Sequence, residues 1–309
     1  MAGLFGSTKT NAEKRKAFRE SLESEELTRL PGAFNPLTAR LIQDIGGFEG
    51  VYISGAVLAN DLGLPDIGLT TLTEVSQRAG QIARATDLPV LVDADTGFGE
   101  PMSAARTIAS LEDAGLAGCH LEDQVNPKRC GHLDGKEVVP TELMVRRITA
   151  AVNERRDENF IICARTDAAG IHGIDEAIER AKAYADAGAD MIFTEALYSE
   201  EDFAQFRAAV DIPLLANMTE FGKTELMSAQ KIQDLGYNAV IWPVSTFRVA
   251  MGATEEFLRD MKDDGLQSKE WLERMQHRSR LYELVRYNEY NDFDQSVFTY
   301  SQETYKPTF

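Results

Sequence analysis

The chain has 309 residues, of which 43% are hydrophobic and 27% are charged, a composition typical of a globular protein with a substantial core. Fifty acidic side chains against 32 basic ones give a net charge of −18, which argues against nucleic acid or an anionic membrane as a partner. A small anionic substrate is compatible with this charge, provided that basic side chains are concentrated at its binding site.

The first 28 residues are polar and charged, and we predict an N-terminal helical segment over 1–28. They contain no apolar stretch typical of a secretory signal, and no run in the chain reaches the ~18 apolar residues of a membrane span. The three cysteines are an odd number scattered along a long chain, which is not a disulfide framework. We therefore expect a cytoplasmic, reduced protein without a membrane partner.

Eight short runs are almost continuously apolar and then end in polar residues. Such runs are typical of parallel strands buried on both faces, because antiparallel strands usually alternate apolar and polar positions. The predicted strands cover residues 30–34, 51–55, 89–95, 118–123, 160–166, 191–196, 213–218 and 239–244.

Segments with helical spacing separate the predicted strands. Pro101 marks a helix start, and Gly115 and Gly188 mark helix ends. Eight successive strand–helix units without a long linker predict a (β/α)8 barrel, with a doubly wound sheet as the alternative. The clearest helical segments cover residues 70–86, 101–115, 141–156 and 174–188.

Helix-rich sequence continues after the eighth unit. We expect one barrel domain over 1–309, in which residues 266–309 form a C-terminal helical tail. Such a tail would pack on a neighbouring subunit or on the barrel itself.

Polar residues follow the predicted strands at the edge where a barrel of this type places its chemistry. Asp93 and Asp95 are two residues apart on a strand, so both carboxylates can face one point. Two carboxylates without a His or Cys cluster suit a hard cation, Mg²⁺ before Zn²⁺. Glu122 and Asp123, from the adjacent strand, could hold metal-bound water. The structural alternative is that Asp93 and Asp95 cap the next helix.

Cys130 lies in a polar, glycine-containing segment beside Lys128, Arg129 and His132. Neighbouring cations lower the pKa of a thiol, which would allow Cys130 to act as a nucleophile or as a general acid–base. An incidental exposed cysteine is the alternative.

The remaining cysteines and two histidines have simpler interpretations. Cys119 and Cys163 lie within apolar strands and are predicted to be small core residues. His120 and His172 have no companion that suggests a metal site, and we expect them to be structural or surface residues.

Arg165 emerges from an apolar strand, and a buried arginine requires a carboxylate partner. Glu195, at the end of the next strand, is the predicted partner. The remaining guanidinium donors would then be available to a substrate carboxylate, although a purely structural ion pair is the alternative.

Several of these motifs resemble the isocitrate lyase / phosphoenolpyruvate mutase superfamily and, within it, the methylisocitrate lyases. The resemblance runs from about residue 30 to 292. It implies a Mg²⁺-dependent (β/α)8 barrel that forms a homotetramer in which C-terminal helices are exchanged between subunits. The matching stretches are LVDADTGFGE (91–100), HLEDQVNPKRCGH (120–132), CARTDA (163–168), FTEA (193–196), NMTEFGKT (217–224) and IWPVSTFR (241–248).

The resemblance also implies roles for individual residues. Asp93 and Asp95 would hold Mg²⁺, with Glu122 joined through water. The catalytic residues would be Cys130, Tyr52 and Arg165. The substrate-binding residues would be Ser54, Gly55, Ala56, Cys130, Gly131, Arg165, Glu195, Asn217, Thr219, Arg248 and Arg278.

The implied reaction is reversible cleavage of 2-methylisocitrate into pyruvate and succinate, a step of the methylcitrate cycle in propionate catabolism. Cys130, on a basic loop that closes over the substrate, would protonate the succinate carbanion, and Tyr52 would take part in deprotonating the hydroxyl. The KRCGH and NMTEFG stretches favour this reaction over that of isocitrate lyases. Gly-Ala-Val after Ser54, and Thr194, depart from the family pattern.

These departures leave isocitrate lyase and 2,3-dimethylmalate lyase as alternatives. A phosphonomutase or an oxaloacetate hydrolase is less compatible with the loop cysteine. A catalytically silent metabolite-binding barrel is the remote alternative, because such a chain would have no reason to keep all the chemical groups.

Overall fold

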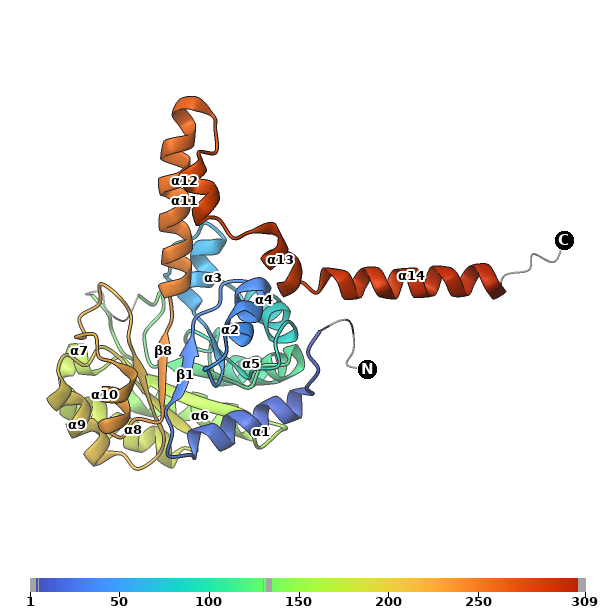
Figure 1. The fold of residues 1–309 in the computed structure, drawn as a ribbon. Helices are drawn as coiled ribbons and strands as arrows, with labels where there is room; N and C mark the ends of the chain where they lie inside the picture. The colour runs from blue at the N-terminus through green and yellow to red at the C-terminus, as the bar shows by residue number, and fades with distance from the viewer. Residues whose placement is uncertain (1–3, 5, 130, 132–134, 305–309) are drawn as a thin grey trace.

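Eight parallel strands form the centre of the structure, a computed structural model that describes residues 4, 6–129, 131 and 135–304, with the backbone alone at 264 and 299–304. Their order is β1-β8-β7-β6-β5-β4-β3-β2, and the two edges meet at a bridge between Gly32 and Tyr52. Figure 1 shows the neighbouring strands β1 and β8. The predicted (β/α)8 barrel is therefore confirmed. The strands are β1 (Thr28–Pro31), β2 (Val51–Ile53), β3 (Val90–Asp93), β4 (Gly118–Glu122), β5 (Ile161–Thr166), β6 (Met191–Thr194), β7 (Leu214–Asn217) and β8 (Ala239–Trp242).

Helices surround the barrel, and further helices extend from it after β8 (Figure 1). None of the helices in the described part of the chain is both long and apolar enough to cross a membrane. The helices are α1 (Asn11–Leu22), α2 (Pro36–Ile45), α3 (Gly55–Asp61), α4 (Leu72–Arg84), α5 (Pro101–Ala114), α6 (Thr141–Glu154), α7 (Ala169–His172), α8 (Ile174–Asp186), α9 (Glu200–Ala209), α10 (Ala229–Asp234), α11 (Ser245–Asp264), α12 (Lys269–Arg274), α13 (Arg278–Leu284) and α14 (Tyr287–Thr304).

The predicted strands and helices are found close to their expected positions. The four predicted helices correspond to α4, α5, α6 and α8, each within two residues at either end. Most of the predicted strands run past the observed ends, and the first begins two residues too late. The reason is that polar residues such as Asp95 and Glu195 follow the strands and belong to the loops at the barrel mouth.

The alternation of side chains along each strand divides the apolar residues into two clusters. In β3, for example, Val90 and Val92 point outward to the helices, whereas Leu91 points into the barrel. Cys119 belongs to the outer cluster and Cys163 to the inner one, and both are fully buried, as predicted. Burial raises the pKa of both thiols.

Helix α1 closes the N-terminal end of the barrel (Figure 1). Its Phe18, with 1% of its surface exposed, and Leu22 belong to the cluster inside the barrel. An ion pair also anchors α1, since Arg19 donates to the Asp190 carboxylate at 2.8 Å. Asp190 also accepts from a second arginine, Arg155. The N-terminal helix thus completes the core of the barrel.

The chain after β8 leaves the barrel. Helices α11 and α12 lie against each other, with Trp271 packed on Phe257 at 5.2 Å between ring centroids. Helix α14 extends away from the barrel (Figure 1). It exposes apolar side chains that include Phe293, Val297 and Phe298.

We expect Phe18→Ala to lower the free energy of unfolding by about 3–5 kcal/mol, because it leaves a cavity where α1 fills the end of the barrel. Urea denaturation followed by circular dichroism measures this loss. Met102→Ala, at a position with 82% of its surface exposed, is the matched control and should lose less than about 0.5 kcal/mol. Equal losses in the two variants would contradict the role assigned to α1.

Candidate active site

A cavity of about 80 Å³ lies at the C-terminal ends of the strands. Side chains from several strands line it together with residues from the loops, as expected of a barrel enzyme. Cys130 and His132 lie outside the described residues, and Arg278 begins α13 and does not line the cavity. The predicted site residues that do line it are Tyr52, Ser54, Ala56, Asp93, Gly131, Arg165, Glu195, Asn217, Thr219 and Arg248.

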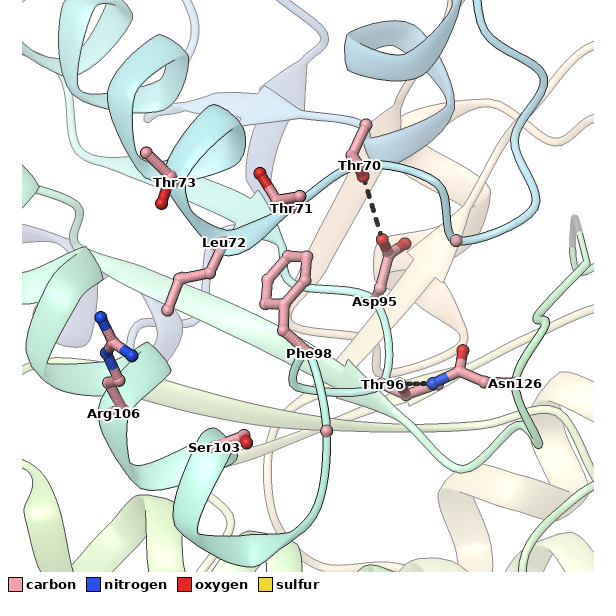
Figure 2. Close-up of a pocket in the computed structure, with 12 residues that line it drawn as sticks. Thr70, Thr71, Leu72, Thr73, Asp95, Thr96, Phe98, Ser103, Arg106 and Asn126 are labelled. Carbon is pink, nitrogen blue, oxygen red and sulfur yellow. Dashed lines mark hydrogen bonds between the residues drawn. The ribbon is translucent and has the colours of Figure 1, made fainter.

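A second, larger cavity of about 450 Å³ lies beside Asp95, where α4 and α5 begin (Figure 2). Figure 2 shows Thr70 donating to Asp95, with Phe98 and Arg106 among the lining side chains. Of the predicted charged residues, Asp93, Arg165, Glu195 and Arg248 line the smaller cavity, whereas Asp95 lines the larger one and Glu122 lines neither. We therefore place the candidate active site there.

Asp93 and Asp95 converge as predicted. The backbone amides of Gly55 and Asp95 donate to the Asp93 carboxylate at 3.1 and 2.9 Å. A Cβ atom at Gly55 would lie 2.8 Å from Asp93 Oδ2 and 3.2 Å from Asp95 Oδ1. Both carboxylates therefore approach one point beside Gly55, where only glycine leaves room for them.

The two acids differ in how readily they ionise. Burial raises the pKa of both carboxyls, but His120, Lys128 and other nearby groups outweigh burial at Asp93 and bring its pKa to about 2. At Asp95, burial outweighs the attraction of Lys128, and the negative charge of Asp93 adds to burial, so the pKa rises to about 6. A cation bound between them would favour the ionised form of both.

Lys128 is a cation already present beside these acids. Its Nζ atom lies 2.8 Å from Asp95 Oδ1 and 2.5 Å from Asp66 Oδ1, and the side chain is buried. Burial opposes its charge, but carboxylates led by Glu122 and Asp95 raise the pKa of Lys128 well above its usual value. The sequence places Lys128 among the cations beside Cys130; in the structure its ammonium group contacts two acids.

Arg165 has a different main partner from the predicted one. Its Nε and Nη2 atoms donate to the two carboxylate oxygens of Asp167 at 2.9 and 3.2 Å. Glu195 and Glu122 are also paired with the guanidinium, but at 3.4 and 3.3 Å. Asp167 forms the forked pair because it lies two residues further along the chain and faces the same side.

Tyr52 and His120 form a buried pair inside the barrel. The Tyr52 hydroxyl lies 2.7 Å from His120 Nε2, and the two rings are stacked. Burial lowers the pKa of His120 to about 4 and raises the pKa of Tyr52 well above its usual value. At neutral pH the phenol keeps its proton, so Tyr52 is suited to orienting a ligand by hydrogen bonding and is a poor base.

The two acids after Leu121 have different surroundings. Neither carboxylate oxygen of Glu122 receives a hydrogen bond from the described residues, although both are buried. Asp123 instead accepts hydrogen bonds from the hydroxyl groups of Thr166 and Tyr184 at 2.8 Å each, and from a backbone amide after β5 at 2.9 Å. Asp123, which we expected to hold metal-bound water, therefore supports the end of β5.

The outer rim carries the remaining predicted residues. Arg248, in the first turn of α11, donates from Nη1 to the Glu220 carbonyl at 2.7 Å and to its carboxylate at 2.9 Å. Its side chain is 44% exposed, and its guanidinium lies over the ring of Phe221. Asn217 donates to Glu195 at 3.4 Å.

Sequence reasoning missed Asp66 and Phe193 as members of the site, and it missed the contact of Lys128 with the acids. Asp66 follows α3 in a loop, and no periodicity or strand end marks it. Phe193 lies beside Arg165, at 5.0 Å from the guanidinium carbon to the ring centre. Its place inside the barrel, alternating with outward-facing residues of β6, is the signal that could have revealed it.

Curated proteins similar to this chain are lyases. The chain is 74% identical over its full length, and over the full length of the relative, to "Probable 2-methylisocitrate lyase 2" of Corynebacterium glutamicum. It is 46% identical to "2-methylisocitrate lyase" of Aeropyrum pernix, with 92% of this chain and 91% of the relative covered.

Solved structures share the fold. A crystal structure of 2,3-dimethylmalate lyase matches with a TM-score of 0.85 and 34% identity, covering 94% of this chain and 96% of the other. A phosphonopyruvate hydrolase in complex with oxalate and Mg²⁺ matches with a TM-score of 0.80 and 27% identity, covering 96% of this chain and 100% of the other.

The family model for phosphoenolpyruvate phosphomutase matches residues 18–262, which include all eight strands of the barrel. Together with the full-length similarity to curated relatives, this match shows that the chain belongs to the phosphoenolpyruvate phosphomutase family.

Proposed function

We propose that this protein is a 2-methylisocitrate lyase, a carbon–carbon lyase that cleaves 2-methylisocitrate into pyruvate and succinate. The observation that carries the proposal is the convergence of Asp93, Asp95 and Arg165 at one barrel mouth, in a chain similar over its whole length to 2-methylisocitrate lyases. The substrate is a tricarboxylate, and basic side chains line this mouth although the chain as a whole is acidic.

Mg²⁺ is the proposed cofactor, and the residues present fit it. Asp93 and Asp95 offer oxygen ligands at one point, and the buried oxygens of Glu122 can accept hydrogen bonds from water. No three His, Cys, Asp or Glu side chains within the described residues form a metal cluster, and the proposed set needs only two direct ligands. Bound Mg²⁺ would act as a Lewis acid toward the substrate hydroxyl and carboxylate.

The protein groups have separate proposed roles in the reaction. Arg165, held by Asp167, directs its remaining charge toward a substrate carboxylate beside Glu195. Tyr52, which keeps its proton, donates a hydrogen bond to the substrate hydroxyl oxygen, which carries negative charge after it is deprotonated and before the carbon–carbon bond breaks. Cys130 delivers the proton that converts the succinate carbanion into succinate.

Backbone and small side chains are proposed to recognise the rest of the substrate. Ser54 and Ala56 line the cavity near the carboxylates, and Gly55 binds Asp93 through its amide. Gly131 lines the same cavity.

Polar groups further out are proposed to bind the outer carboxylates. Asn217, Thr219 and Arg248 line the cavity, and Arg278 would reach it from a neighbouring subunit. The fold match to 2,3-dimethylmalate lyase makes that activity the second candidate, since both substrates are branched hydroxyacids.

We further propose a cytoplasmic homotetramer that acts in the methylcitrate cycle of propionate catabolism. Apolar side chains exposed on α11 and α14, such as Val249, Phe293 and Phe298, support an assembly in which C-terminal helices pack on another subunit. The free, buried Cys119 and Cys163 are compatible with a reducing compartment.

The proposed activity is tested by measuring pyruvate release from 2-methylisocitrate beside glyoxylate release from isocitrate and pyruvate release from 2,3-dimethylmalate. We expect the highest kcat/KM with 2-methylisocitrate, and loss of activity when Mg²⁺ is removed with EDTA. Cys130→Ser should abolish turnover while pyruvate and Mg²⁺ still bind, as measured by calorimetry. Faster glyoxylate release, or near-normal turnover by Cys130→Ser, would contradict the assignment.

Lys128→Met should strengthen Mg²⁺ binding in the absence of substrate by about tenfold, because the ammonium group that now neutralises Asp95 is removed. Isothermal titration calorimetry with MgCl₂ measures the change. Asp93→Asn is the opposite control and should weaken binding. Unchanged Mg²⁺ affinity in Lys128→Met would mean that the cation binds elsewhere.

Removing α14 by ending the chain at Arg286 should convert the tetramer into smaller species, because its exposed apolar face would no longer join subunits. Light scattering after size-exclusion chromatography measures the mass of each species. A double variant, Phe293→Asp with Val297→Asp, tests the same face in the full-length chain. A tetramer that survives both changes would place the subunit contact on another surface.

A further inference from the structure

The loop between β4 and α6 has a fixed base. Gln124 and Val138 form an antiparallel bridge, and the amide of Val125 donates to the Glu137 carbonyl at 2.8 Å. The two arms of the loop are therefore held together where the loop leaves the barrel.

One side chain from each arm reaches into the loop. From the first arm, the Gln124 amide group donates to the Arg129 carbonyl and accepts from the Arg129 amide, both at 2.9 Å. From the second arm, Lys136 Nζ donates to the Gly131 carbonyl and to Asp167 Oδ1, the latter at 2.9 Å. The described residues 129 and 131 are thus each held by a side chain of the loop base.

Gly131 lies against the charged centre of the site. A Cβ atom there would lie 2.5 Å from Glu195 Cγ and closer still to Arg165 Nη2. The backbone of Gly131 therefore rests directly on the Arg165–Glu195 pair, and no larger residue would fit without moving it. Because Lys136 binds both Gly131 and Asp167, it connects this backbone to the main carboxylate partner of Arg165.

A purely structural role for Lys136 would be to neutralise Asp167. The Asp167 carboxylate, however, already forms a forked ion pair with Arg165. The backbone amide of Asp167 also donates a hydrogen bond to the Asp123 carboxylate. The contact between Lys136 and the Gly131 carbonyl adds nothing to this charge balance. Only 4% of the Lys136 side chain is exposed, so its ammonium group is held at this contact and is not free in solvent.

We propose that Lys136 is a positioning residue that holds the backbone of Gly131 against the Arg165–Glu195 pair and so sets the geometry of the loop for catalysis. Its effect on turnover rests on the proposed lyase function, whereas its effect on the loop does not. The inference therefore has two separate readouts.

The test compares Lys136→Met with Lys136→Arg, which restores a charged donor, and with the control Lys182→Met. Lys182 lies on α8 and pairs with Glu179 on the surface. The first readout is kcat/KM for 2-methylisocitrate. The second is the rate of cleavage after Arg129 by an arginine-specific protease, followed by mass spectrometry on the native full-length protein.

We expect Lys136→Met to lower kcat/KM by about tenfold or more, because a small displacement of a peptide unit at the reacting site reduces turnover strongly. Cleavage after Arg129 should become about tenfold faster, since the loop loses a hydrogen bond from a charged donor. Lys136→Arg should recover most of both properties, and Lys182→Met should match the wild type. Lys136→Gln replaces the methionine variant if that variant does not fold.

Wild-type kcat/KM in a folded Lys136→Met protein overturns the inference, whether or not the loop is cleaved faster. Reduced kcat/KM with an unchanged cleavage rate also overturns it, because Lys136 would then not act through the loop. If the wild type does not cleave 2-methylisocitrate, the proposed function fails, and the cleavage rates still decide whether Lys136 holds Gly131.

Discussion

Arg165 is buried at the mouth of the barrel, and an arginine at that depth requires counter-charges. Carboxylates from Asp167, Glu122 and Glu195 surround its guanidinium. These acids come from the ends of β4, β5 and β6, so the register of neighbouring strands fixes the electrostatics of the cavity. Asp123 supports this arrangement from outside by accepting a hydrogen bond from the amide of Asp167.

Several of the acidic side chains serve as partners of basic groups buried near the cavity. Lys128 lies between Asp66 and Asp95, and Lys136 contacts Asp167, so these basic groups are embedded among acids. Such mixed clusters keep cations charged in a buried place, where an anionic substrate can meet them without a basic protein surface.

The fold can be predicted from the sequence because eight almost continuously apolar runs, typical of strands buried on both faces, alternate with segments of helical spacing. The same pattern places Asp93 and Asp95, at the end of β3, and Arg165 at one mouth, since the C-terminal ends of parallel strands share one side of a barrel. It cannot choose between Glu195 and Asp167 as the closer partner of Arg165, because that choice depends on side-chain direction at the strand end. Contacts between loop residues also cannot be predicted from the sequence. Asp66 and Lys128 are far apart along the chain, and only the folded structure shows that their side chains meet.

The position of α1 affects the order in which the chain can fold during synthesis. Phe18 packs in the same interior cluster as Ala239 and Ile241 of β8, so a helix that is synthesised early has its binding place completed by the last strand of the barrel. Until β8 has been synthesised, the interior cluster that covers Phe18 and Leu22 lacks Ala239 and Ile241. A nascent chain stalled before β8 would therefore hold this helix on an incomplete core.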